Sequence, residues 1–136
     1  MDRTGTSTEK AKTRWFIALD WHQRNNRSFF ALANDCLCAK CRKQLSAEEK
    51  EITEAELITT IKDCCSSAPE FITSRLPVLE SIFRLFLANG NQPLTLGGLG
   101  NQLNERLSGD TYRTSEEMLS RLLKNDQYYG IRPVTD

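Results

Sequence analysis

The chain has 136 residues, of which 39% are hydrophobic and 26% charged, with 18 basic and 18 acidic residues. This length suits one ordinary domain or two small units that share a core, and it excludes a second large domain. The composition is typical of a folded globular protein and argues against wholesale disorder. No apolar run reaches the roughly 18 residues of a membrane-spanning helix, so we expect no association with membranes.

Residues 1–13 are polar and rich in Thr, Ser and Lys, and we expect them to form a disordered tail. Because this segment lacks the apolar stretch of a secretory signal, we expect the protein to be cytoplasmic. In that reducing compartment, the five cysteines of the chain favour metal binding or free thiols over disulfides.

Charge is unevenly distributed along the chain. Residues 1–45 hold nine Lys and Arg against four Asp and Glu, residues 46–74 hold two against seven, and residues 75–136 hold seven of each. Nucleic-acid-binding surfaces usually have a basic excess, because their cations displace the counterions of the phosphates. The first segment therefore supplies candidate phosphate contacts, with Arg42 and Lys43 foremost, while the acidic segment is typical of a solvated helix face.

Aromatic and aliphatic residues recur at helical spacing near the start of the chain. Trp15, Phe16 and Leu19 form a first group, and Phe29 belongs to a second group beyond a polar interruption. This pattern predicts one long helix, or two, from about residue 13 to residue 34. His22, the single histidine of the chain, lies among these aromatic residues, and we expect it to be a packed residue and not a ligand.

The cysteines form a candidate metal site. Cys38 and Cys41 are spaced as in a zinc knuckle, where two thiolates three positions apart bind one ion and turn amides hydrogen-bond to the sulfurs. We expect Cys36, Cys38, Cys41 and Cys64 to hold a structural zinc ion, with Cys65 as the alternative. Neighbouring residues of a helix project about 100° apart, so Cys64 and Cys65 are not both expected to bind. Thiols without metal and an iron–sulfur cluster are the competing interpretations.

Two helix starts follow the first cysteine group. Ser46 precedes a Glu three positions later, and Thr53 precedes Glu56 in the same way, the spacing of a capping box. From Thr53, the apolar spacing predicts a helix that ends near Ser66. Pro69 and its polar neighbours then mark a boundary between two units. We therefore divide the chain into a tail (1–13), a helical, cysteine-rich metal-binding unit (14–70) and a C-terminal unit (74–136).

The C-terminal unit predicts three helices and a short strand. An apolar stripe begins at Pro77, a second helix runs from Leu96 to Leu107 behind the cap Thr95, and Thr114 or Ser115 caps a third. The segment from 128 to 134 is too short and too rich in β-forming residues for anything but a strand. The predicted fold class is therefore mainly α.

This order of elements resembles a winged helix-turn-helix domain over residues 77–134. The resemblance rests on the turn at residues 93–96, the leucine spacing of the second helix, the Thr-Ser-Glu start of the third helix and the Tyr-Tyr-Gly-Ile-Arg segment at 128–132. It implies that the third helix enters the major groove of DNA. Carried over by position, the nucleic-acid contacts of that helix would be Arg113, Ser115, Glu116, Ser120, Arg121 and Lys124, and Arg132 would be the contact of the wing.

The residues and the resemblance together predict a non-enzymatic, nucleic-acid-associated regulatory or accessory protein with structural zinc, binding DNA in preference to RNA. The alternative is an adaptor that docks a protein partner through the winged helix and the aromatic N-terminal helix, or a homodimer formed through the same aromatic face. We expect no enzyme, because no nucleophile has a paired base and the glycines at 97–100 do not fit a phosphate-binding loop.

Overall fold

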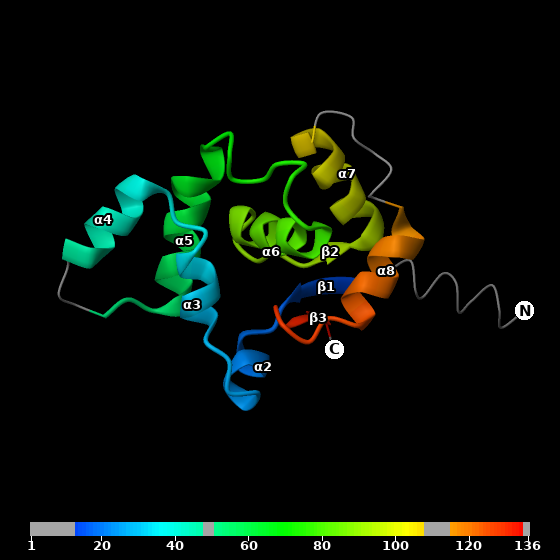
Figure 1. Ribbon diagram of the computed structural model, residues 1–136. Coiled ribbons are helices and arrows are strands. Elements are labelled where there is room, and N and C mark those ends of the chain that lie inside the picture. The colour runs from blue at the N-terminus through cyan, green and yellow to red at the C-terminus, as the bar shows by residue number, and fades with distance from the viewer. Residues whose placement is uncertain (1–12, 48–50, 108–114, 135–136) are drawn as a thin grey trace, which may run out of the picture.

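The computed structural model describes residues 13–47, 51–107 and 115–134. Helices and a small three-stranded antiparallel sheet make up this part of the chain (Figure 1), which confirms the mainly α class. The elements are β1 (Arg14–Ile17), α2 (Leu19–Arg24), α3 (Phe29–Asn34), α4 (Ala39–Ala47), α5 (Glu54–Asp63), the 3₁₀ helix η1 (Cys65–Ser67), α6 (Val78–Ala88), β2 (Leu94–Thr95), α7 (Leu96–Leu107), α8 (Glu116–Lys124) and β3 (Ile131–Pro133). The expected tail, apart from Thr13, lies outside the described residues. Ser46, expected to cap the start of a helix, lies instead in the last turn of α4, and its expected capping partner Glu49 lies outside the described residues.

The first element, β1, is a strand, so the prediction of a helix from residue 13 is wrong there. It is the central strand of the sheet, with the order β2-β1-β3, and both of its pairings are antiparallel. Trp15 and Ile17 are buried on one face, whereas Arg14 is exposed. Over four residues, apolar spacing does not separate a strand from a helix. Pairing with β2 and β3, which come much later in the chain, decides that these four residues form a strand.

Two short helices, α2 and α3, occupy the rest of the region where one or two helices were predicted. Asn26 adopts a left-handed conformation with φ of 55° between them. Ser28 caps α3, because its Oγ accepts the N–H of Ala31 over 3.1 Å. These short helices place His22 and Phe29 in the interior, where both side chains are buried.

Helix α5 begins as the sequence predicts and ends earlier. Thr53 Oγ1 accepts the N–H of Glu56 over 3.1 Å, and the Glu56 carboxylate accepts the N–H of Thr53 over 2.9 Å, which confirms the capping box. The helix stops at Asp63, and Cys64 has φ of −128° and ψ of −65° before η1 starts at Cys65. The prediction of a continuous helix to about Ser66 is therefore wrong.

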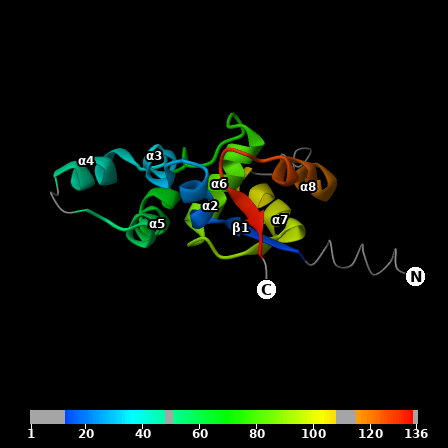
Figure 2. The same ribbon diagram turned by 90° about the horizontal axis from the view of Figure 1, so that it is seen from below.

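Helix α6 lies at the centre of the molecule, between α5, α7 and the sheet (Figures 1 and 2). Its buried residues are Ser81, Ile82, Phe83, Leu85, Phe86 and Leu87. Helices α7 and α8 pack together at one side, and they bury the stripes that begin at Leu96 and Leu119. The predicted helices at 96–107 and after Ser115 and the terminal strand are confirmed.

One continuous core joins residues from both predicted units, among them Trp15 and Cys41 of the first and Leu123 and Ile131 of the second. Among the described residues, no helix combines the length and the apolar character that crossing a membrane requires.

Candidate metal centre and nucleic-acid interface

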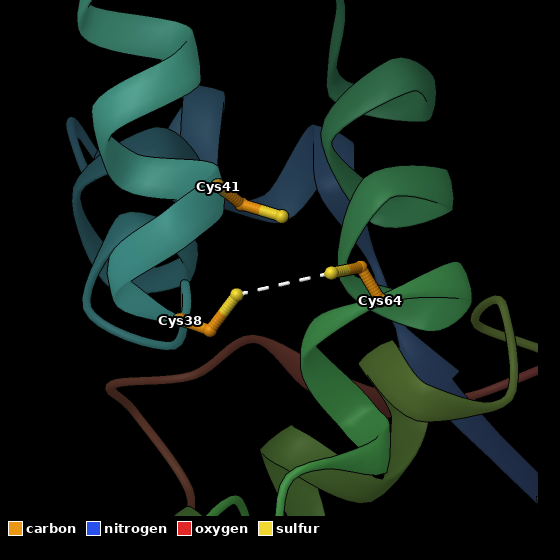
Figure 3. Close-up of side chains that lie close together, drawn as sticks. All are labelled: Cys38, Cys41 and Cys64. Atoms are coloured by element: carbon orange, nitrogen blue, oxygen red, sulfur yellow. Dashed lines mark hydrogen bonds between the residues drawn. The ribbon is translucent and has the colours of Figure 1, made fainter.

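Three thiols converge between α4 and the end of α5 (Figure 3). Cys38 directly precedes α4, Cys41 lies in its first turn, and Cys64 follows α5. Their sulfur atoms all lie within 4.8 Å of one another, and the Sγ atoms of Cys38 and Cys64 are 3.9 Å apart. Zinc bound tetrahedrally at Zn–S distances near 2.3 Å holds its sulfurs about 3.8 Å apart. The spacing therefore fits a thiolate metal site.

Cys65 adds a fourth sulfur at the edge of this group. Its Sγ lies 3.5 Å from the Sγ of Cys38 and accepts the backbone N–H of Cys38 over 3.2 Å. The expectation that Cys64 and Cys65 do not both bind assumed that they share one helix. Because the chain leaves the α-helix after Asp63, both sulfurs reach Cys38. The two serines that follow Cys65 are weak helix formers, and they were the sequence signal available for an early end of this helix.

Cys36 does not join the three clustered thiols. It is buried, and its Sγ donates to the carbonyl oxygen of Leu32 over 3.7 Å. Burial raises the pKa of the Cys36 thiol to about 11, and its sulfur is not among those that lie within 4.8 Å of one another. Of the predicted ligands Cys36, Cys38, Cys41 and Cys64, the structure therefore brings together the last three.

The thiols of the cluster differ in their tendency to ionise. The backbone N–H of Cys41, with help from the Cys65 thiol, lowers the pKa of Cys38 to about 7. Burial raises the pKa of Cys41 and of Cys65. A bound cation would supply the positive charge that buried thiolates require. The sulfur-only donor set is typical of zinc or of an iron–sulfur cluster. All five cysteines have free thiols.

The residues predicted to contact DNA from α8 occupy different positions on that helix. Ser115 caps its N-terminus, where its Oγ accepts the N–H of Met118 over 3.3 Å. Ser120 is buried at 4% exposure, so its hydroxyl lies on the inner face of α8. Arg121 and Lys124 are exposed, and Arg121 forms an ion pair of 3.8 Å with Glu117. Arg113 lies outside the described residues.

Arg132 is tied into the fold. Its Nη2 donates to the carbonyl oxygen of Asp126, and its guanidinium carbon lies 5.2 Å from the centre of the Trp21 ring. Asp126 is itself buried, and its carboxylate accepts the N–H of Ile131 over 2.9 Å. Arg132 therefore closes the turn between α8 and β3. It is half-buried, and with Lys124 it lines a hollow beside Trp15.

On α4, Arg42 and Lys43 are both exposed. Arg42 donates to the carbonyl oxygens of Asn34 over 3.2 Å and of Leu37 over 3.4 Å, which holds it against the loop before α4. Within the described part of the chain, Lys43 makes no such contact with the backbone. The structure thus leaves two groups of exposed predicted contacts, one on α4 and one on α8.

Comparison of the chain with protein-family models, curated proteins and solved structures finds no match. The cysteine cluster and the exposed cations of α4 and α8 are the features of this chain that point to a function.

Proposed function

We propose that the protein is a non-enzymatic, nucleic-acid-associated regulatory or accessory protein whose C-terminal part is a winged helix-turn-helix unit. The observation that carries the proposal is the packing of α7 on α6 and α8, with β3 following α8 and pairing with the sheet. This order of helices and strands is the one that places a third helix where it can enter a groove of DNA. Duplex DNA is the preferred ligand over RNA.

The sulfur cluster supports a structural zinc ion in this proposal. Cys38, Cys41 and Cys64 supply three thiolates, and Cys65 is the nearest donor for the fourth position. Four thiolates leave no open position on a tetrahedral ion, so the metal would brace the fold and carry out no chemistry. Zinc analysis of protein purified without chelator tests this: about one equivalent supports it, and less than a tenth contradicts it. A visible absorbance with bound iron would favour an iron–sulfur cluster instead.

Fluorescence anisotropy with labelled duplex DNA and single-stranded RNA tests nucleic-acid binding. Titrations at about 50 mM and 200 mM salt separate electrostatic binding from no interaction, because phosphate contacts weaken steeply with salt. Tighter binding at the lower salt, stronger for duplex DNA, supports the proposal. Absence of binding to either nucleic acid at about 50 mM salt contradicts it.

The second candidate function is a protein-interaction adaptor. Exposed aromatic side chains favour it, since Phe30 is 41% and Tyr128 49% exposed. The outer face of α8 also mixes Glu116 and Glu117 with its two cations, which suits a protein partner as well as it suits DNA. Trp15, at 6% exposure, belongs to the core and is not part of this docking face. Sedimentation that gives a monomer at high concentration would argue against the homodimer form of this function.

A further inference from the structure

Helix α4 is weakly attached to the rest of the molecule. Of its nine residues, all described, Cys41 alone is fully buried, and Leu45 is partly buried against the core. Both views place α4 at the outer end of the molecule beyond α5, opposite the end that holds α8 (Figures 1 and 2). Isolated helices shorter than about 12 residues are marginal in water. The stability of α4 therefore depends on what links it to α5.

The cysteine cluster lies at that link. Cys38 and Cys41 stand at the start of α4, while Cys64 and Cys65 stand at the junction of α5 with η1. Figure 3 shows the sulfurs of Cys38 and Cys41 directed from the α4 side toward the sulfur of Cys64. An ion bound by these sulfurs would cross-link α4 to an element that packs on α6.

The same helix carries a basic surface. Lys40, Arg42 and Lys43 are exposed on α4, and with Ala39 and Ser46 they line a shallow hollow of about 620 Å³. Among the described residues, no carboxylate lines this hollow. The sequence has no acidic residue between residues 36 and 47, and the acidic stretch begins at residue 48. Three cations on one helix suit a phosphate backbone, which carries a repeating negative charge. The outer face of α8 lacks this excess.

We propose that α4 is the surface that contacts the phosphates of duplex DNA, and that a metal ion at the cysteine cluster holds α4 in place, so that DNA binding depends on the metal. This inference rests on the proposed nucleic-acid function and names its surface and its control. By thermodynamic linkage, bound DNA then tightens metal binding by the same factor by which metal tightens DNA binding.

Two double variants of equal charge change locate the contact surface. K40A/K43A removes two cations from α4 and leaves Arg42, whose bonds to Asn34 and Leu37 hold the local fold. R121A/K124A removes two cations from α8, at the other end of the molecule. In zinc-loaded full-length protein, the slope of log K against log salt for labelled duplex DNA should fall in magnitude by about 1.8 in K40A/K43A. It should fall by less in R121A/K124A, because Glu116 and Glu117 offset the cations of α8.

Removal of the metal tests the second half of the inference. Stripping zinc from wild-type protein with a chelator should weaken DNA binding at about 50 mM salt by tenfold or more, and restoring zinc should recover it. Hydrogen exchange provides a readout that is independent of DNA: amides of residues 39–47 should lose protection on stripping, while those of α6 keep theirs. In a titration with increasing chelator concentration, the DNA-bound protein should retain more zinc than the free protein.

The outcomes separate this inference from the proposed function. DNA binding that weakens in R121A/K124A and not in K40A/K43A overturns the α4 surface and leaves the proposed function intact. Unchanged DNA affinity after stripping, or unchanged exchange in residues 39–47, overturns the role of the metal. Absence of DNA binding by zinc-loaded wild-type protein overturns the proposed function and the inference together.

Discussion

The side-chain amide of Asn91 pairs with both backbone polar groups of Ile17, which lies 74 positions earlier in the chain. Asn91 Nδ2 donates to Ile17 O over 2.9 Å, and Asn91 Oδ1 accepts the Ile17 N–H over 2.8 Å. Strand β2 pairs with β1 only at Arg14 and Trp15, so Asn91 takes the place of a strand beside Ile17. This pairing fixes the first strand to the turn that follows α6.

We predict that N91A lowers the free energy of unfolding by about 2 to 3 kcal/mol, because it leaves the buried backbone groups of Ile17 unpaired on that side. Asn91 has φ of 62°, a conformation that disfavours Ala as well. N91G removes that strain and still loses both bonds, so it should remain destabilised. Urea denaturation measures both variants, with the exposed Gln92 replaced by Ala as the control. Wild-type stability in N91G would contradict the role of the pairing.

The environment of His22 leads us to predict that the stability of the protein depends on pH. Its Nε2 donates to Tyr129 O over 2.7 Å, and its buried Nδ1 has no hydrogen-bond partner among the described residues. Burial lowers the pKa of His22 below its ordinary value of 6.5. At a pH below about 6.5, His22 binds a proton more readily in the unfolded chain than in the folded chain. The contribution of His22 to the free energy of unfolding is therefore complete above about pH 6.5 and is lost as the pH falls below it.

Unfolding free energies measured between pH 7.5 and pH 5.5 should therefore decrease in the wild type, with a slope from this group of at most about 1.4 kcal/mol per pH unit. H22Q keeps a side-chain N–H donor and does not titrate, so it should show a flatter profile. Parallel profiles for wild type and H22Q would refute the assignment to His22.

Two glycine substitutions should change stability in opposite directions. Gly130 has φ of +72°, and a Cβ there would lie 2.7 Å from Nε2 of His22 and 2.8 Å from the Trp21 ring. We expect G130A to destabilise the protein by more than about 2 kcal/mol, since both the backbone conformation and the two adjacent rings oppose it. Gly97 lies in the first turn of α7, where a Cβ would meet only ordinary contacts near Glu116.

G97A should stabilise the protein by up to about 1 kcal/mol, because Ala is the better helix former. Thermal unfolding of the two variants against wild type provides the measurement. A stabilised G130A or a strongly destabilised G97A would contradict the turn and helix geometry.

The cysteines predict a selective loss of metal. C64S and C65S should reduce bound zinc well below one equivalent, because each removes a sulfur close to Cys38. C36S should retain zinc, since the Cys36 thiol is hydrogen-bonded to Leu32 and lies outside the three-thiol group. Metal content after gel filtration, together with the thiolate absorbance of cobalt-substituted protein, distinguishes the variants. Loss of metal in C36S with retention in C65S would reverse the assignment.

The amino-acid pattern alone was sufficient for several features that residues close in sequence decide. The capping box at Thr53 and the cap at Ser115 follow from side-chain oxygens that satisfy unpaired N–H groups within three residues. The leucine stripes of α7 and α8 follow from the helical period over at least nine residues. The close spacing of Cys38 and Cys41 similarly predicted that both belong to one group.

The tertiary structure alone decided the features that depend on distant partners. Arg14–Ile17 is a strand because β2 and β3 pair with it, and four residues hold too little periodicity to predict that. Cys65 approaches Cys38 because the chain leaves the α-helix at Cys64. Ser120 is buried because α8 turns that face toward the core. In each case, the deciding contact is formed by residues far apart in sequence or by a local break that the apolar pattern does not mark.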